Sequence, residues 1–297
     1  MRKTQIFSSF FLKIFAIVFM TLDHVGLLLK WLYPTSYDIN IIHNILRGFG
    51  RIALPLFIFM IVEGVLHTKS IKKYMLRLGI IALIISIGIL VITNVNISAD
   101  ISSIKGMGNI FLDLLLTALT IYLLKQPNNY KKLFILLPIA ISIISFCIKC
   151  YETETHNLVY WYPYWLYMQY DWYSILLGVG FFYSYKLADS YLSHYSNQSG
   201  IEVSVLEENG IKRGAANIIG VLLMIGASLL LYAFAYIWPK GIYWDATAQF
   251  TAIFSGAFLL FYSGKRGYNA KWFKYFSYAY YPLSLIIIFI IYICIGG

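Results

Sequence analysis

The chain has 297 residues; 60% are hydrophobic, 12% are charged, and the net charge at pH 7 is +10. A soluble domain carries roughly 25% charged residues, so this composition excludes an ordinary soluble domain, and most of the surface must face something other than water. The basic residues do not indicate nucleic-acid binding, because they lie in short loops between apolar runs, as in membrane proteins. We therefore expect a single integral membrane domain over residues 1–297, with the lipid bilayer around it.

Apolar runs recur along the chain at about the 20 residues that a helix needs to cross a bilayer. They predict an all-α fold, a polytopic transmembrane helix bundle with about nine spanning helices. A tenth segment, either re-entrant or interfacial, stays open. The expected spans are 8–29, 47–67, 74–94, 109–124, 132–150, 171–188, 214–237, 246–262 and 275–294.

Lysine and arginine are divided unequally between alternate loops. Sixteen fall in one set: Arg2, Lys3, Lys69, Lys72, Lys73, Arg77, Lys125, Lys131, Lys132, Lys186, Lys212, Arg213, Lys265, Arg266, Lys271 and Lys274. Four fall in the other: Lys30, Lys105, Lys149 and Lys240. Because cytoplasmic loops are enriched in these residues, we expect the N-terminus in the cytoplasm and the C-terminus outside. The expected location is the cytoplasmic membrane of a bacterium, with the first helix retained rather than cleaved as a signal peptide.

Three further features have no unique interpretation from the sequence. Residues 151–173 are acidic at first and then densely aromatic, which suits an interfacial belt, a re-entrant segment, or a platform for an acceptor sugar or peptide. Cys147 and Cys150 form a CxxC without a second pair or a histidine cluster, so they are interpreted as membrane thiols and not as a zinc site. Asp113 lies in the span NIFLDLLLT and has no assigned role.

The first span contains Asp23 and His24 within LKIFAIVFMTLDHVGLLL. An ionisable residue costs about 2.5–3.5 kcal/mol at the centre of a membrane helix, and such residues mark functional sites by default. Adjacent side chains on a helix point about 100° apart, so each must find a partner on another helix or in a water-filled cavity. A purely structural histidine is the alternative.

The second span begins RGFGRIALPLFIFMIVEGVLHT. Arg47 and Arg51 are four residues apart, which places both on one face near the expected outer end. Glu63 and His67 repeat this spacing near the cytoplasmic end, and Pro55 between the two pairs predicts a kink. An arginine can pair with the aspartate of the first span, contact substrate, or do both.

Two basic clusters lie in expected cytoplasmic loops. Lys73 and Arg77 are four residues apart in HTKSIKKYMLRLG, and Lys265 with Arg266 lies between two glycines in YSGKRGYNAKWFK. Topology alone explains such residues. A nucleotide cofactor with several phosphates, however, needs a similar cluster at a cytoplasmic entrance, and glycine lets the backbone approach an anion closely.

Several blocks of this sequence resemble, in the same order, the TraX family: LKIFAIVFMTLDHVG, RGFGRIALPLFIFMIVEGVLHTKSIKKYMLRL, NIFLDLLLTAL, DWYSILLGVGFFY, and FYSGKRGY followed by FSYAYYPLSL. The resemblance runs nearly from end to end, and its motifs are quite specific in combination. That family is named for the enzyme that N-acetylates the pilin of conjugative pili. It is similar to a wider group of transmembrane acyltransferases that use cytosolic acetyl-CoA.

The resemblance implies that His24 is the catalytic histidine and that Asp23 is its companion. The other residues that fall on family motifs or on basic positions suited to coenzyme A phosphates are Arg47, Arg51, Glu63, His67, Lys73, Arg77, Lys265 and Arg266. One departure is clear, because Ser284 of YPLS stands where the family usually has histidine. Serine can hydrogen-bond but cannot act as a base at neutral pH, which leaves His24 as the obvious base.

The sequence thus predicts an enzyme, a transmembrane acetyltransferase with acetyl-CoA as its acyl donor. The acceptor would be an amine or hydroxyl of a peptide N-terminus or a cell-envelope glycan near the outer face. His24 would act as base and Arg47 or Arg51 would stabilise charge. A proton-coupled small-molecule transporter, which also uses intramembrane ionisable groups, and a non-catalytic membrane assembly partner are the alternatives. No metal and no nucleic acid are expected, and a homodimer stays open.

Overall fold

A computed structural model describes residues 4–94, 108–237 and 249–296. Arg2, Lys3, Lys105 and Lys240 of the charge count, and the start of the expected span 246–262, lie outside the described residues. The described part is all α, and its only β contacts are two isolated bridges.

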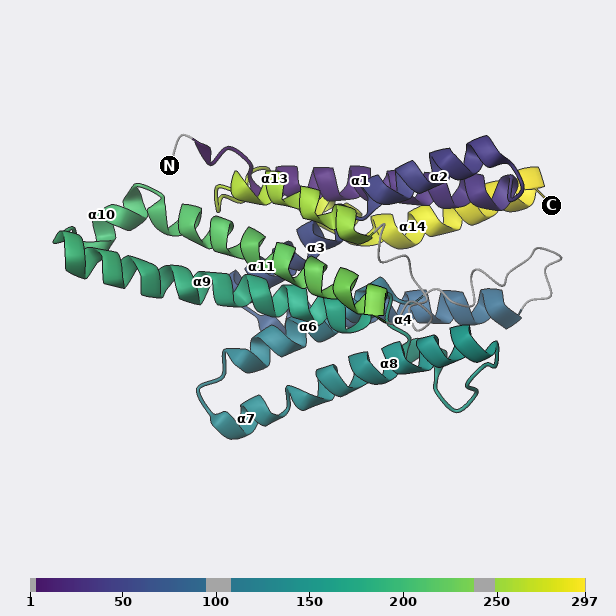
Figure 1. Cartoon of the computed structure of the whole chain (residues 1–297), viewed down its shortest axis with the longest axis horizontal. Helices are drawn as coiled ribbons and strands as arrows, with labels where there is room; N and C mark the ends of the chain where they lie inside the picture. The colour runs from purple at the N-terminus through teal and green to yellow at the C-terminus, as the bar shows by residue number, and fades with distance from the viewer. Residues whose placement is uncertain (1–3, 95–107, 238–248, 297) are drawn as a thin grey trace.

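The helices follow one another along the chain as a bundle (Figure 1). They are α1 (Ser9–Leu32), α2 (Tyr37–Gly50), α3 (Ala53–His67), α4 (Ile71–Asn94), α6 (Ile110–Leu124), α7 (Asn129–Leu133), α8 (Leu136–Thr155), α9 (Asp171–Ser199), α10 (Val203–Glu208), α11 (Ile211–Ile237), α13 (Gly256–Leu260) and α14 (Lys271–Gly296). Two short 3-10 helices, η2 (Tyr164–Leu166) and η4 (Thr251–Ser255), complete the set.

Six helical segments of the described chain are long and apolar enough to cross a membrane. They are Ser9–Leu32, Tyr37–His67, Ile71–Val91, Asn129–Thr155, Ile211–Ile237 and Lys271–Ile295, and the shorter apolar helices are Ile110–Leu124 and Thr251–Leu260. This confirms an all-α bundle of the multi-pass membrane type. Helix is present within each of the nine expected ranges, while the count of nine spans and their orientation stay predictions.

The second expected span, 47–67, starts too late. Residues 37–50 form α2, which folds back on α1 as an antiparallel hairpin and continues into α3, so that Tyr37–His67 is one helical run of 31 residues. The missed signal is an N-cap, because the Ser36 hydroxyl accepts from Ile39 N at 3.4 Å and begins the helix where a loop was expected. Arg47 and Arg51 consequently lie within this run and not near its outer end.

The run is interrupted between α2 and α3, at Arg51 and Ile52. Pro55 explains the position of the interruption. Its ring removes the N–H that would bond the carbonyl four residues earlier, and it clashes with that carbonyl, which belongs to Arg51. The kink itself stays a prediction, while the interruption lies where Pro55 predicts it.

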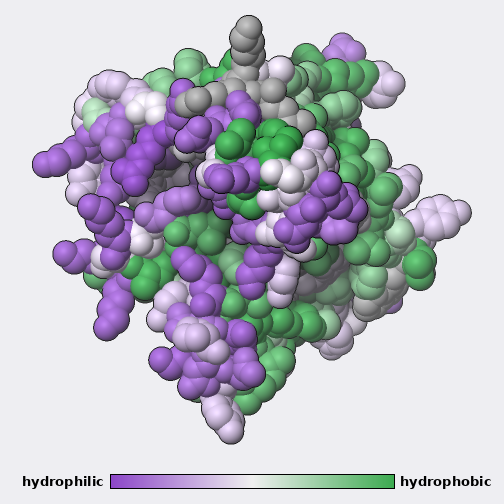
Figure 2. Space-filling view, turned by 90° about the vertical axis from the view of Figure 1, so that its left-hand side faces the viewer, coloured by the Kyte–Doolittle hydropathy of each residue, from purple (hydrophilic) through white to green (hydrophobic). Residues whose placement is uncertain are grey.

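Helices α1 and α14 run parallel and side by side (Figure 1). Phe10 and Phe273 stack near their starts, with ring centroids 4.8 Å apart, and Trp31 and Tyr292 meet near their far ends at 5.7 Å. We call the end of the bundle where these two helices begin the basic end, because the loop before α14 carries Lys265. Figure 2 faces this end and shows hydrophilic residues gathered over it, with hydrophobic residues on the flanks.

Residues 156–170 return from the end of α8 toward the middle of the bundle, where α9 begins (Figure 1). Met168 N donates to Ser145 Oγ at 3.0 Å. Because Ser145 lies ten residues before the end of α8, the chain has come back by about 15 Å. Relative to the helices the segment is re-entrant, which is one of the alternatives that its composition left open.

Candidate functional site

His24 lies inside the bundle, where its imidazole contacts the last helix. Its side chain is 5% exposed, and Nδ1 is 2.9 Å from Ser284 Oγ on α14. The same hydroxyl donates to the carbonyl of Tyr281 at 2.8 Å, and the Tyr281 ring lies 5.5 Å from the imidazole. The residue that departs from the family pattern is therefore the direct neighbour of the predicted base.

Asp23 turns toward α2 and not toward α14. Its Oδ2 accepts from Arg47 Nη1 at 2.7 Å, and both side chains are mostly covered. This ion pair confirms that one of the two arginines makes the buried aspartate tolerable. Its other oxygen, Oδ1, is buried next to Gly50 and has no hydrogen-bond partner within the described chain.

Two glycines allow α1 and α2 to approach closely enough for this pair. A Cβ on Gly50 would come within 2.3 Å of Asp23 Cβ, and one on Gly26 would come within 3.0 Å of Leu46 Cβ. Any larger residue at position 50 would push the carboxylate away from Arg47. The glycines of RGFGR and DHVG thus let α1 and α2 pack closely, and the polar residues of the same motifs form the ion pair between these helices.

Arg51 points to a different partner from Arg47. It is 4% exposed and donates from Nη1 to the hydroxyl of Tyr170 at 3.1 Å. Tyr170 stands at the end of the re-entrant segment, directly before α9. The sequence predicts both arginines on one helix face, but they contact different elements. Arg47 contacts α1, and Arg51 contacts the re-entrant segment.

The structure gives Asp113 a structural role that the sequence did not predict. Its two carboxylate oxygens accept from the backbone N–H groups of Gln169 at 2.6 Å and Tyr170 at 3.0 Å. It therefore holds the non-helical backbone next to Arg51, because buried N–H groups require acceptors. Asn109 caps the same helix, accepts from Phe111 N at 3.0 Å and donates to Ala82 O at 2.6 Å.

A second buried ion pair was not anticipated. Lys149 Nζ lies 2.7 Å from Asp171 Oδ2, with side chains 3% and 0% exposed, and it also donates to the carbonyl of Met168. The charge count had assigned Lys149 to a loop, and this is wrong, because α8 extends to Thr155. A lysine within the apolar run AISIISFCIKC was the available signal, since such a cation requires a partner.

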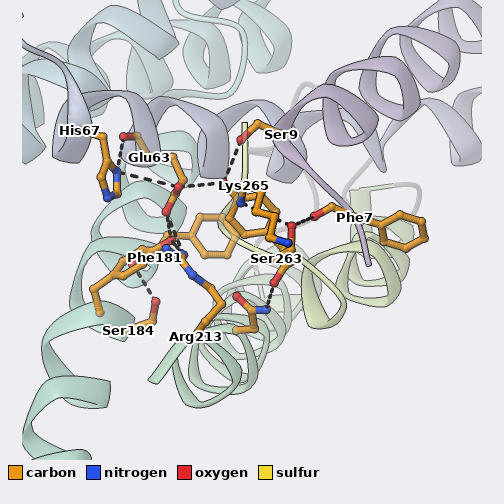
Figure 3. A network of polar contacts seen from close by, with 12 residues as sticks. Phe7, Ser9, Glu63, His67, Phe181, Ser184, Arg213, Ser263 and Lys265 are labelled. Carbon is orange, nitrogen blue, oxygen red and sulfur yellow. Dashed lines mark hydrogen bonds and ion pairs between the residues drawn. The ribbon is translucent and has the colours of Figure 1, made fainter. Parts of the chain in front are cut away.

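Glu63 is the centre of a polar network at the basic end (Figure 3). Its carboxylate accepts from Arg213 Nη1 at 3.0 Å, from Tyr262 OH at 2.8 Å and from Tyr185 OH. Tyr262 OH in turn lies 2.8 Å from Ser9 Oγ at the start of α1. The network joins α3, α9, α11, α1 and the loop after α13, so Glu63 fixes how these elements meet.

His67 lies beside this network but is exposed. Its Nδ1 is 3.0 Å from the carbonyl of Glu63 and 3.9 Å from the Glu63 carboxylate. The network therefore leaves the ring accessible at the surface of the basic end. Direct contact of His67 or Glu63 with a cofactor stays a prediction.

The loop that carries Lys265 and Arg266 is fixed by its backbone, while its side chains are exposed. The carbonyls of these two residues accept from Ser9 N at 2.8 Å and Phe10 N at 3.1 Å, which satisfies free N–H groups at the start of α1. Gly267 has φ 68°, and a Cβ there would lie 2.2 Å from Ser8 Oγ. Glycine is thus required for the turn that presents the two cations.

Arg77 and Lys73 lie in the first two turns of α4, at the same end. The Arg77 guanidinium lies 5.8 Å from the centre of the Tyr74 ring and within electrostatic range of Lys274 on α14. Lys73 is exposed. Both predicted basic clusters therefore flank the start of α14, although no described contact joins one cluster to the other.

The predicted site residues thus form two groups. Asp23, His24 and Arg47 lie together with Ser284 in the interior, and Arg51 lies nearby. The basic residues lie at the end of the bundle. His24 is 15 residues beyond Ser9, so about 22 Å of α1 separates the two groups.

The described residues contain no cluster of three or more metal-ligating side chains. Cys147 is exposed and Cys150 is buried, and both are free thiols. The interpretation of the CxxC as plain membrane thiols stays a prediction.

Comparison with known proteins identifies the family of this chain. A model described as TraX protein matches residues 8–204, a range that contains the interior residues of α1 and α2 but not α14. Over 118 residues the chain is 36% identical to the "Probable fimbrial assembly protein FimC, serogroup H1" of Dichelobacter nodosus, covering 39% of this chain and 46% of that relative. The chain thus spans about half the length of that curated relative. No solved structure matches it. Because the family model covers more than half of the 297 residues, the chain belongs to the TraX protein family.

Proposed function

We propose that the protein is a membrane acetyltransferase that moves an acetyl group from acetyl-CoA to an amine or hydroxyl acceptor. The observation that carries the proposal is the buried imidazole of His24, which contacts the Ser284 hydroxyl at 2.9 Å and lies within electrostatic range of the Asp23–Arg47 ion pair. A neutral imidazole is the side chain best suited to take a proton near pH 7. A histidine with only a packing role would need neither a hydroxyl partner nor an ion pair nearby.

The other interior residues have complementary roles in this proposal. The Arg47 cation, held by Asp23 at 2.7 Å, stabilises negative charge on the thioester oxygen as it develops. Asp23 positions this cation, because its Oδ2 holds Arg47 while its Oδ1 is buried next to Gly50. Arg51, through Tyr170, supports the same region from the re-entrant segment.

The basic end binds the nucleotide part of acetyl-CoA in this proposal. Lys265 and Arg266 stand on a turn shaped by Gly267, and Lys73 and Arg77 stand on α4 nearby. Because acetyl-CoA is cytosolic, this end faces the cytoplasm of a bacterium, and the C-terminus lies outside, in agreement with the loop charges. Glu63 and His67 act there as supports of the entrance, because the Glu63 carboxylate already accepts from three donors.

The acceptor lies toward the other end. The similar Dichelobacter nodosus protein is named a fimbrial assembly protein, which favours the N-terminal amine of a pilin-like peptide. A cell-envelope glycan is second, since Tyr160 and Trp161, 85% and 76% exposed, offer flat apolar faces on the returning segment.

The test is acetyl transfer by purified protein in detergent. Wild type should bind acetyl-CoA and release or transfer acetate, and His24→Ala should retain binding but lose at least about 100-fold in turnover. His194→Ala, at an exposed position of α9, is the matched control and should match wild type. Absence of acetyl-CoA binding by wild type would sink the proposal.

A non-catalytic role in fimbrial assembly is the second candidate, and the name of the similar Dichelobacter nodosus protein supports it. It differs from the first in that His24→Ala would leave assembly unchanged. A proton-coupled transporter, the remaining alternative, would move a small solute in vesicles without acetyl-CoA.

A further inference from the structure

We propose that Ser284 carries the acetyl group as an ester between the two halves of the reaction. The inference rests on the proposed function and specifies its route. His24 then takes a proton first from Ser284 and afterwards from the acceptor. The acetyl group is transferred in two steps and not directly.

The geometry brings a nucleophile and a base together on two parallel helices. Between the aromatic contacts at their two ends, α1 and α14 are joined by Thr21 and Tyr280, whose hydroxyls are 2.7 Å apart, and by His24 and Ser284 at 2.9 Å. A hydroxyl and an imidazole within about 2.6–3.2 Å form the arrangement by which serine nucleophiles are activated. These contacts recur along both helices, so the packing of α1 against α14 sets the distance between His24 and Ser284.

The Ser284 proton has two acceptors. It points either to the Tyr281 carbonyl at 2.8 Å or to His24 Nδ1, and attack requires the second orientation. Pro282 follows Tyr281 within α14, where it removes one helical N–H and loosens the turn. Ser284 is half-buried, whereas His24 is 5% exposed.

The position of His24 within the bundle favours two steps over one. Its Nδ1 is occupied by Ser284, so an incoming acceptor cannot use that nitrogen while the contact persists. Donor and acceptor also approach from opposite ends in the proposed function. A covalent stage allows coenzyme A to leave before the acceptor arrives.

In the first step His24 Nδ1 takes the Ser284 proton while Oγ attacks the thioester carbonyl. The carbon–sulfur bond breaks, and the departing thiolate takes the proton from the imidazolium, which releases coenzyme A as the thiol. In the second step the acceptor amine attacks the ester carbonyl and gives its proton to His24. The carbon–oxygen bond to Ser284 breaks, and Oγ recovers its proton.

The test uses full-length protein in detergent with acetyl-CoA labelled in the acetyl group and no acceptor. After rapid quenching and denaturation, label should remain on wild type and map by mass spectrometry to the peptide that contains Ser284. Ser284→Ala should bind acetyl-CoA but carry only background label. Ser284→Cys should carry label as a thioester, which neutral hydroxylamine releases.

Ser277→Ala is the matched control. Its hydroxyl makes the same kind of bond, to the Phe273 carbonyl at 2.7 Å, two turns earlier on the same helix, and its loss should leave labelling unchanged. A second readout is exchange of labelled free coenzyme A into acetyl-CoA without acceptor, which only a covalent route allows. Wild type should show it and Ser284→Ala should not.

Three results are decisive. Label on Ser284 together with exchange supports the two-step route. Acetyl transfer to an acceptor by wild type without label or exchange, and with transfer kept in Ser284→Ala, overturns it and leaves direct transfer. Failure of wild type to bind acetyl-CoA overturns the proposed function itself.

Discussion

The guanidinium of Arg51 donates to the hydroxyl of Tyr170 at 3.1 Å, across 119 positions of sequence. This contact connects the interruption between α2 and α3 to the end of the re-entrant segment. The backbone of Tyr170 is held in turn by Asp113. The interior site is therefore supported by a segment that is not itself helical.

Tyr170→Phe should lower the free energy of unfolding by on the order of 1 kcal/mol, the usual range for a hydrogen bond inside a membrane protein. Acetyl transfer should also decrease, because Arg51 loses a partner that orients it. Unfolding in denaturing detergent and turnover with acetyl-CoA measure the two effects. Tyr160→Phe, at an 85% exposed position, is the control, and equal behaviour of the two variants would contradict the prediction.

Lys149→Met should be one of the most destabilising substitutions in the chain. It leaves the fully buried Asp171 carboxylate without its cation, and breaking such a pair costs about 3–5 kcal/mol. The double variant with Asp171→Asn should recover part of the loss, since asparagine tolerates the φ of 51° at this position. Expression level and unfolding in detergent report the change.

Lys212→Met provides the comparison for that pair. Its partners Asp189 and Glu207 are about half exposed, so it should cost at most about 1 kcal/mol. If the double variant of Lys149 and Asp171 were as unstable as Lys149→Met alone, the uncompensated charge would not be the cause.

The sequence predicts the helices well and the irregular segments poorly. Apolar runs and Pro55 are local signals, and they match helices and the interruption between α2 and α3 in the structure. The start of α2 was missed because INIIHNIL is less apolar than its neighbours, although Ser36 offered a cap. The return of residues 156–170 depends on acceptors contributed by α6 and α8, and no local pattern encodes such long-range contacts.

The sequence predicted the ion pair of the interior site but not its contact between His24 and Ser284. Their positions within apolar spans predicted that Asp23 pairs with Arg47 or Arg51, and the structure joins it to Arg47. The contact between His24 and Ser284 joins residues 260 positions apart. The serine looked like a loss relative to the family pattern, and only the parallel packing of α1 and α14 shows it beside the predicted base.

Tyr162 gives a test of the returning segment by pH. Burial raises the pKa of Tyr162 to about 12, and its hydroxyl donates to the Leu166 carbonyl at 3.1 Å. A tyrosine pKa above the unfolded value of about 10 means that the contribution to stability is complete below pH 10. It is lost as the pH rises toward 12.

Tyr162→Phe should accordingly be less stable than wild type at pH 8, and the difference should shrink between pH 10 and 12. Unfolding in detergent at several pH values measures it. Tyr151→Phe, at an exposed position of α8, should show a constant small difference, and a constant difference for Tyr162→Phe as well would contradict the prediction.

Lys265→Ala and Arg266→Ala should each weaken acetyl-CoA binding by about tenfold, since a charge-assisted hydrogen bond contributes about 1.5 kcal/mol or more. Turnover at saturating acetyl-CoA should stay near the wild-type value, because these residues are about 22 Å from His24 along α1. The expected signature is a raised KM with an unchanged kcat. Lys131→Ala, an exposed lysine of α7, is the control and should change neither.

A donor that lacks one phosphate sharpens this test. Wild type should bind acetyl-CoA more tightly than its dephosphorylated analogue, and the variant that has lost the matching cation should bind both alike. Equal binding of the two donors by the variant would show that this side chain interacts with that phosphate. A general disturbance of the Gly267 turn would weaken the binding of both donors and keep the difference between them. If both variants kept the full preference for the phosphorylated donor, the phosphates would bind elsewhere on the basic end, with Lys73 and Arg77 as the next residues to change.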